Sequence, residues 1–141
     1  MDIRHLTPAY AVTPQIAVED VPAIAAAGFG TVICNRPDAE VPPSHQAAAL
    51  KAAVEGAGMT FVVNPVTHAG LNMDMVETQA NAMAASDKPV LAYCASGNRS
   101  SVVWALGQAG TQSPDDLIAT TAKAGYDLSG LRRQLEALHQ A

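Results

Sequence analysis

Short apolar runs alternate along the chain with longer segments in which apolar residues recur at helical spacing. Each run is almost wholly apolar and lies between turn-forming residues, a pattern typical of strands that are buried on both faces. The predicted strands are residues 9–12, 31–34, 60–63 and 90–93.

The segments between these runs predict helices. Val21, Ile24 and Ala25 share one helical face, and Gly28 is a C-terminal stop. Ser44 is a good N-cap for the next helix, which Gly58 closes. The predicted helices cover residues 18–27, 44–57, 73–85 and 100–108, a segment that begins at 113–114, and residues 129–140.

This alternation predicts an α/β fold: a mostly parallel sheet of four to five strands with helices on both faces. In such sheets, ligands bind at the carboxyl ends of the strands. The loops at residues 35–40, 64–72 and 94–99 are therefore expected to converge at one edge of the sheet. Of the three, only the last carries an explicit chemical signature.

Composition and charge narrow the class of protein. The 141 residues predict a single domain, residues 1–141, and 49% hydrophobic against 15% charged residues excludes intrinsic disorder. The net charge of −5 argues against a nucleic-acid or anionic-membrane partner. The sequence shows no signal peptide and no apolar stretch near ~18 residues, so we expect a cytoplasmic protein that does not bind or span a membrane.

The candidate chemistry lies in residues 90–107, VLAY-CASGNR-SSVVWALG. Cys94 ends a predicted strand just before a helix, and Arg99 follows it, so helix dipole and guanidinium both favour the thiolate. Ser100 can donate its hydroxyl to that thiolate or to a leaving sulfur. Small loop residues let consecutive N–H groups point inward and form an anion-binding nest. The predicted anion-binding residues are Ala95, Ser96, Gly97, Asn98 and Arg99.

The other residues that could carry chemistry have simpler interpretations. Cys34 also ends a predicted strand, but its surroundings favour core packing over a redox role. The four histidines are scattered without metal-ligand spacing. We therefore expect neither a metal site nor a cofactor.

The motif C-x-x-G-x-R-S (94–100) resembles the signature loop of cysteine-dependent phosphatases and of rhodanese-like sulfurtransferases. Together with NRPDAE (35–40), it resembles the phosphatase-like domain of beta-lactamase-hydrolase-like proteins over about residues 5–110. The resemblance implies a three-layer tyrosine-phosphatase-like fold, with Cys94 as nucleophile and Arg99 as anion clamp. In fusions of this family, a partner domain resembles persulfide-oxidising enzymes, which makes such an enzyme a candidate partner.

Three differences favour sulfur transfer over dephosphorylation, and one of them is that the loop at residues 64–72, the expected source of a general acid, holds no Asp or Glu. Four residues separate Cys94 from Arg99, one fewer than in phosphatases of this type and the spacing typical of rhodanese-like enzymes. Tyr93 stands where those phosphatases usually have His. Our first hypothesis is therefore a sulfurtransferase that passes sulfane sulfur through a Cys94 persulfide. The alternatives are a phosphatase that forms a phosphocysteine and a non-catalytic module that binds an anion or a persulfide. The expected substrate is a small sulfur- or phosphate-bearing molecule.

Auxiliary residues are expected in the other two loops of this edge. Arg36 could add positive potential, while Asp38 or Glu40 could hold Arg36 or Arg99 in place; the alternative is a structural turn capped by Asp38. A phosphatase also needs a general acid. The loop at residues 64–72 offers His68, and Asp74 lies just beyond it, although a carboxylate there is ordinarily a helix-dipole partner.

Overall fold

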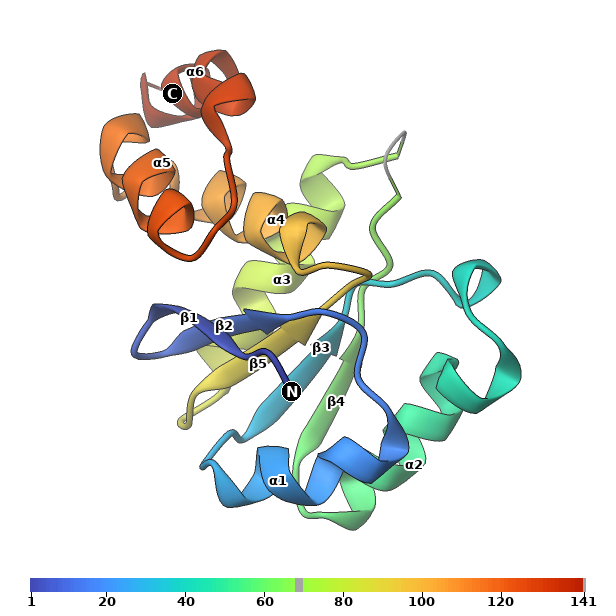
Figure 1. Cartoon of the computed structure of the whole chain (residues 1–141). Coiled ribbons are helices and arrows are strands. Elements are labelled where there is room, and N and C mark those ends of the chain that lie inside the picture. The colour runs from blue at the N-terminus through green and yellow to red at the C-terminus, as the bar shows by residue number, and fades with distance from the viewer. Residues whose placement is uncertain (68–69, 141) are drawn as a thin grey trace.

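The computed structural model describes residues 1–67 and 70–140. The described residues fold into a central sheet with helices on both sides (Figure 1). The strands are β1 (Arg4–Thr7), β2 (Tyr10–Thr13), β3 (Thr31–Cys34), β4 (Thr60–Val63) and β5 (Val90–Tyr93). The helices are α1 (Val21–Ala26), α2 (Ala47–Gly56), α3 (Met73–Ala85), α4 (Asn98–Gln108), α5 (Pro114–Lys123) and α6 (Arg132–Gln140).

The sheet has the strand order β1-β2-β5-β3-β4, and only β1 runs antiparallel to its neighbour. β5 lies at its centre, where Val90 pairs with both Tyr10 and Thr31. All four residues of β2, β3 and β5 are buried, because helices cover both faces of these strands. The predicted mostly parallel sheet is confirmed.

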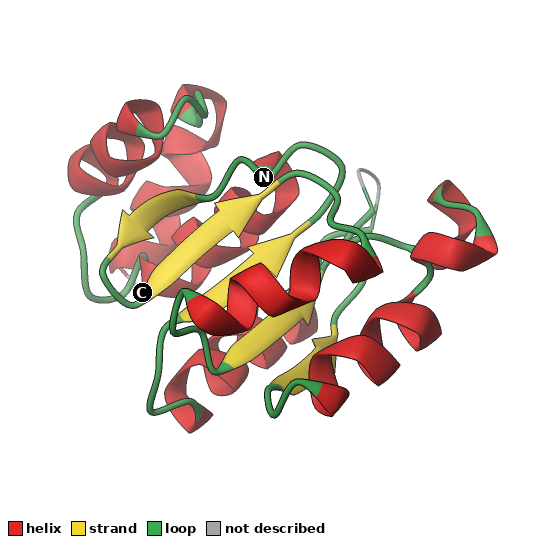
Figure 2. Ribbon diagram, turned by 60° about the horizontal axis from the view of Figure 1, so that its bottom comes forward, coloured by secondary structure: helices red, strands yellow, loops and turns green. Residues whose placement is uncertain are grey.

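The helices form two layers, one on each face of the sheet (Figure 2). One core cluster contains apolar side chains of α1 and α2, including Ile24 and Leu50. The other contains side chains of α3 to α6, including Val76, Trp104 and Leu135. The predicted three-layer architecture is therefore confirmed.

Several predicted boundaries are wrong at the ends of helices. Ser44 lies in a short 3-10 turn and does not cap α2, which begins at Ala47. The Asp38 carboxylate, nine residues earlier, accepts the Ala47 N–H at 2.8 Å and supplies the missing cap. Helix α4 begins two residues before the predicted Ser100, because Gly97 adopts a left-handed conformation that lets the helix start at Asn98.

The remaining differences concern short elements. The predicted helices 18–27 and 129–140 are each divided into a 3-10 turn followed by a shorter α-helix. Strand β1 was not predicted, because its sequence RHLT is mostly polar and only Leu6 is buried. It forms by antiparallel pairing with β2 across the turn at residues 8–9. None of the described helices is long and apolar enough to cross a membrane.

Candidate active site

The predicted catalytic loop connects the central strand β5 to helix α4. Cys94 directly follows β5 and is 1% exposed. The loop then turns back, so that the Gly97 N–H donates to the Cys94 Sγ at 3.1 Å. The sulfur therefore lies near the N-terminus of α4, where the helix dipole favours negative charge.

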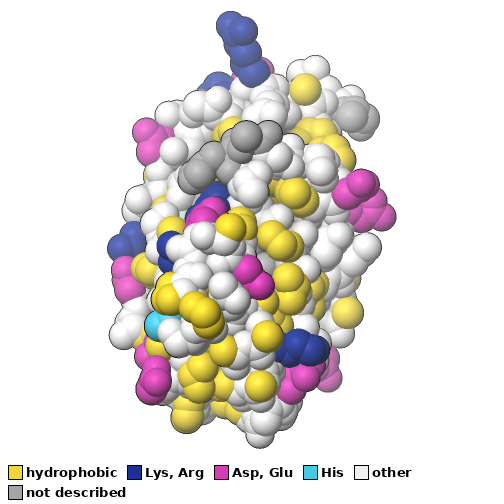
Figure 3. All heavy atoms as spheres, turned by 90° about the vertical axis from the view of Figure 1, so that its right-hand side faces the viewer, with side chains coloured by type: hydrophobic (Ala, Val, Ile, Leu, Met, Phe, Trp, Pro, Cys, Tyr) yellow, Lys and Arg dark blue, Asp and Glu magenta, His cyan; other side chains and the backbone are white. Residues whose placement is uncertain are grey.

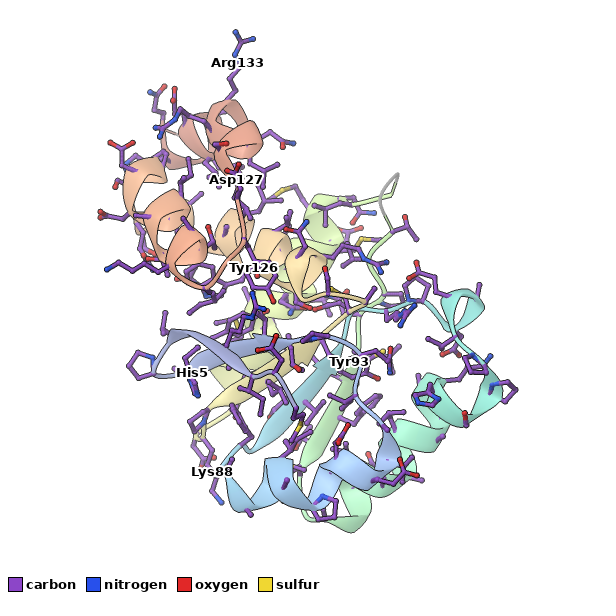
Figure 4. All side chains as sticks on the ribbon, viewed as in Figure 1. His5, Lys88, Tyr93, Tyr126, Asp127 and Arg133 are labelled. Carbon is purple, nitrogen blue, oxygen red and sulfur yellow. The ribbon has the colours of Figure 1, made fainter. Side chains whose placement is uncertain are left out.

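Gly97 allows this loop to close against the C-terminal part of the chain. Its φ of +96° favours glycine, and a Cβ at this position would collide with the Tyr126 hydroxyl. That hydroxyl donates to the Ser96 carbonyl oxygen at 2.8 Å. Tyr126 lies on the segment after α5 (Figure 4). The Arg4 guanidinium lies 5.3 Å from the centre of its ring. A residue distant in sequence thus fixes one carbonyl of the loop.

Arg99 is held at one end of its guanidinium by the loop that follows β3. Its Nη1 and Nη2 donate to the two carboxylate oxygens of Glu40 at 2.8 and 2.7 Å, and Nη1 also donates to the Val66 carbonyl. The Nε–H and the second Nη2 hydrogen have no oxygen acceptor among the described residues. The Glu40 carboxylate raises the pKa of Arg99, and the nearby Cys94 sulfur acts in the same direction. Glu40 therefore holds the guanidinium while leaving a two-donor edge for an anion.

The same ion pair lowers the pKa of Glu40, mainly through its hydrogen bonds with Arg99. Arg36 adds a longer contact to Glu40, at 3.4 Å, and donates to the Gln15 amide oxygen at 3.3 Å. In the loop at residues 35–40, Glu40 thus holds Arg99 and Arg36, while Asp38 caps helix α2 and not the turn that was the alternative prediction.

A buried polar network lies under the catalytic loop. The Ser100 hydroxyl donates to the Asn35 amide oxygen at 2.8 Å, so its proton points away from Cys94 in this structure. Gln79 donates to the same Asn35 oxygen and to the Tyr10 hydroxyl, which in turn donates to the Ser100 carbonyl. Asn64 donates to Gln79. The network ties the start of α4 to α3, to the residues that follow β3 and β4, and to the first residue of β2.

Comparison with known proteins places the chain in a family. Residues 2–111 match the family model described as the phosphatase-like domain of beta-lactamase hydrolase-like proteins. The chain belongs to this family. A beta-lactamase hydrolase-like protein of Agrobacterium fabrum is 31% identical over 86% of this chain and 29% of its own length. The chain spans about three-tenths of the curated relatives it matches.

Solved structures with the same fold carry phosphatase names. A candidate phosphatase of Neisseria meningitidis is 34% identical, with a TM-score of 0.85 over 98% of this chain and 99% of its own. A kinase associated phosphatase whose catalytic-site cysteine is replaced by serine has a TM-score of 0.73 over 99% of this chain and 91% of its own. At 14% identity it supports the fold alone. The fold is that of tyrosine and dual-specificity phosphatases. These names favour the phosphatase alternative over our first hypothesis of sulfur transfer.

The structure brings the residues of the predicted loop together, and it describes one of the two candidate general acids, Asp74. Ala95, Ser96 and Asn98 form the exposed rim, and Arg99 is buried below it. Asp74 is exposed in the first turn of α3 and makes no hydrogen bond or ion pair among the described residues. His68 lies outside the described residues. No group of three or more His, Cys, Asp or Glu that could hold a metal occurs in the described part of the chain.

Sequence reasoning did not find Tyr126, Gln79 or Tyr10. Gln79 had one usable signal, because it is a polar residue three positions after Val76, on the face of α3 that turns out to be buried. Tyr126 and Tyr10 had none, since each meets the loop only through the fold.

A cavity of about 630 Å³ adjoins the site on its α4 side and includes Arg99 and Asn98 in its lining, but not Cys94. On the face shown in Figure 3, acidic and basic side chains are interspersed among hydrophobic ones.

Proposed function

We propose that the chain is a cysteine-dependent phosphatase that acts on a small phosphate monoester. The observation that carries this proposal is the arrangement around one point: the Gly97 N–H faces the Cys94 sulfur, and Glu40 holds Arg99 with two N–H groups on the edge beside that sulfur that donate to no oxygen of the described residues. Donors fixed in advance around a reacting centre stabilise charge that develops there.

The reaction would proceed in two steps. The Cys94 thiolate attacks phosphorus, forming a P–S bond, while the ester P–O bond breaks and the leaving oxygen takes a proton. Water then attacks the phosphocysteine, which releases inorganic phosphate and restores the thiolate. The loop N–H groups and Arg99 hold the non-bridging oxygens in both steps. Asp74 and His68 are the candidates for the proton donor.

Sulfur transfer is the second candidate, and the short loop favours it. Four residues between Cys94 and Arg99 make a tighter bowl, better matched to one added sulfur than to a phosphoryl group. In this reaction, the thiolate attacks a sulfane sulfur, the donor leaves as its anion, and an acceptor thiolate or cyanide takes the outer sulfur. No general acid is required. For this candidate, an enzyme that oxidises persulfides is the proposed partner.

One paired assay separates these candidates. The wild type is given an aryl phosphate in one series, and thiosulfate or glutathione persulfide with cyanide in the other; released phosphate and thiocyanate are measured. Cys94→Ser should lose the activity, whereas Cys34→Ser, a matched control at the end of the neighbouring strand, should keep it.

Phosphate release that depends on Cys94 would support the phosphatase, and thiocyanate formation that depends on Cys94 would replace it with sulfur transfer. Activity that survives in Cys94→Ser would contradict the site itself. Turnover in neither series, together with sulfate or phosphate binding that Cys94→Ser retains, would leave the non-catalytic module.

A further inference from the structure

The cavity beside the catalytic loop is a groove that runs along helix α4. Asn98, Val102 and Leu106 lie at intervals of four residues and form its floor. At about 1.5 Å per residue, this stripe extends about 12 Å from the catalytic loop. The start of α3 forms one wall and α6 forms the other, with Val76 and Leu138 among their contributions.

Arg99 contributes to one end of the groove, and most of the other lining residues are apolar. Arg99 is the one described lining residue with an ionised side chain, and it lies at the end next to Cys94. The other lining side chains are aliphatic, thioether, amide or hydroxyl groups. Met73, at the start of α3, is 55% exposed, one of the few large hydrophobic side chains that face solvent. An occupant should therefore be anionic at the Arg99 end and uncharged elsewhere.

The size of the groove fits a small molecule. A volume of about 630 Å³ lies within the usual range for small-molecule sites, roughly 300–1,000 Å³. The α6 wall lies beyond residues 2–111, the part of the chain that matches the family model. The groove is thus built partly from a segment that the family match does not cover.

We infer that the groove binds the apolar arm of the substrate, so that the substrate is an amphiphilic small molecule. Its phosphate would lie in the Cys94 loop, and an alkyl or alkyl-aryl arm about 12 Å long would lie over Val102 and Leu106. This inference rests on the proposed function for the identity of the anionic group. The length and polarity of the arm rest on the groove alone.

The test compares substrates that differ only in the arm. For the wild type, kcat/KM for para-hexylphenyl phosphate should exceed that for phenyl phosphate by about tenfold to a hundredfold, since each buried methylene contributes up to about fourfold. Leu138→Gln should reduce this ratio about tenfold. Val102→Thr, which is nearly isosteric, should reduce the ratio in the same direction. Glu136→Gln, on exposed α6 surface outside the groove, is the matched control and should change nothing.

A ratio near one in the wild type, or an equal loss in Leu138→Gln and Glu136→Gln, would overturn the inference. Binding of methylphosphonate and hexylphosphonate to Cys94→Ser, measured by calorimetry, separates this failure from failure of the proposed function. Hexylphosphonate could bind at least about tenfold more tightly than methylphosphonate, with Leu138→Gln removing that gain, while no phosphate ester is hydrolysed. This result would support binding of an apolar arm in the groove and contradict the phosphatase activity. If esters are hydrolysed and the two phosphonates bind with equal affinity, the phosphatase activity is supported and binding of an apolar arm in the groove is contradicted.

Discussion

Cys34 is the last residue of β3 and Cys94 directly follows the neighbouring parallel strand β5, yet the chain beyond each cysteine creates an opposite environment. After β3, the chain turns so that the Cys34 thiol donates to the Arg36 carbonyl at 3.3 Å, and burial raises the pKa of this thiol. After β5, the chain turns so that the Gly97 N–H donates to the Cys94 sulfur at 3.1 Å. One sulfur therefore faces an acceptor and the other a donor.

This contrast shows that strand position alone does not make a cysteine a nucleophile. A carbonyl beside the sulfur stabilises the protonated thiol, whereas an N–H at a helix N-terminus and a nearby guanidinium stabilise the anion. The β3 loop nevertheless serves the same site, because it supplies Glu40 to Arg99. The loop after β5 thus surrounds the reacting sulfur, and the loop after β3 holds Arg99 in place.

The largest effect is expected for Gly97→Ala, which should remove the donor environment of Cys94. Alanine would be strained at this positive φ and would collide with the Tyr126 hydroxyl, so the loop must shift. We expect a loss of about 2–4 kcal/mol in the free energy of unfolding and about a hundredfold in kcat/KM. Urea denaturation and turnover of an aryl phosphate would measure these losses.

Gly58→Ala is the matched control for this prediction. Gly58 also has a positive φ, +86°, but open space lies around its Cβ position. Gly58→Ala should lose only the free energy of unfolding that a strained backbone at positive φ costs, about 1–2 kcal/mol, and it should keep its activity. Equal activity in the two variants would contradict the proposed role of the loop conformation.

Glu40→Gln should have the next largest effect, because it removes the charge that holds Arg99. We expect a decrease of about tenfold or more in kcat/KM, since a misplaced clamp no longer meets the anion. Because pairing lowers the pKa of Glu40, its contribution to stability is present above the pKa of the unfolded carboxyl group. That contribution is lost as the pH falls through the lowered folded value. The difference in unfolding free energy between wild type and Glu40→Gln should therefore shrink on acidification. A difference that grows in acid would refute the ion pair as its cause.

A smaller effect is expected for Tyr126→Phe, which keeps the ring beside Arg4 and removes only the hydroxyl. The Ser96 carbonyl would lose its partner, at a cost of about 0.5–1.5 kcal/mol in unfolding free energy. The less restrained loop should lower kcat by roughly threefold to tenfold. An unchanged kcat with reduced stability would show that Tyr126 is structural only.

Asp38→Ala should have the smallest effect on activity, and it separates the two roles of the β3 loop. Removing the cap of α2 should cost about 1 kcal/mol in unfolding free energy. Turnover should stay within about twofold of wild type, since Glu40 remains in place. A loss of turnover as large as that of Glu40→Gln would mean that capping of α2 by Asp38 and positioning of Arg99 by Glu40 are not independent.

The sequence predicted the parts of this molecule that are encoded locally. The strands TVIC, TFVV and VLAY are contiguous apolar runs, and their bounds agree with the structure. The spacing of Cys94 and Arg99 likewise lies within one loop. Glu40 could be identified only as one of two candidates, since the choice between Asp38 and Glu40 depends on which carboxylate faces Arg99.

The parts that were missed depend on contacts between distant segments. Gln79 meets Asn35 across 44 residues and Tyr10 across 69, and Tyr126 meets Ser96 across 30. Strand β1 exists only because β2 offers a pairing edge. Such contacts leave no periodic signal along the chain, because the fold and not local spacing brings the partners together.

Trapping the covalent intermediate would test directly whether Cys94 is the nucleophile. The wild type would be mixed with an aryl phosphate, quenched within one turnover, digested and analysed by mass spectrometry. We predict a phosphoryl group on the peptide that contains Cys94 and none on the peptide that contains Cys34. A sulfur adduct on Cys94 after the same treatment with thiosulfate, with no phosphoryl adduct, would replace the phosphatase with sulfur transfer. A phosphoryl group on Cys34, or on neither cysteine while phosphate is released, would contradict the assignment of Cys94 as nucleophile.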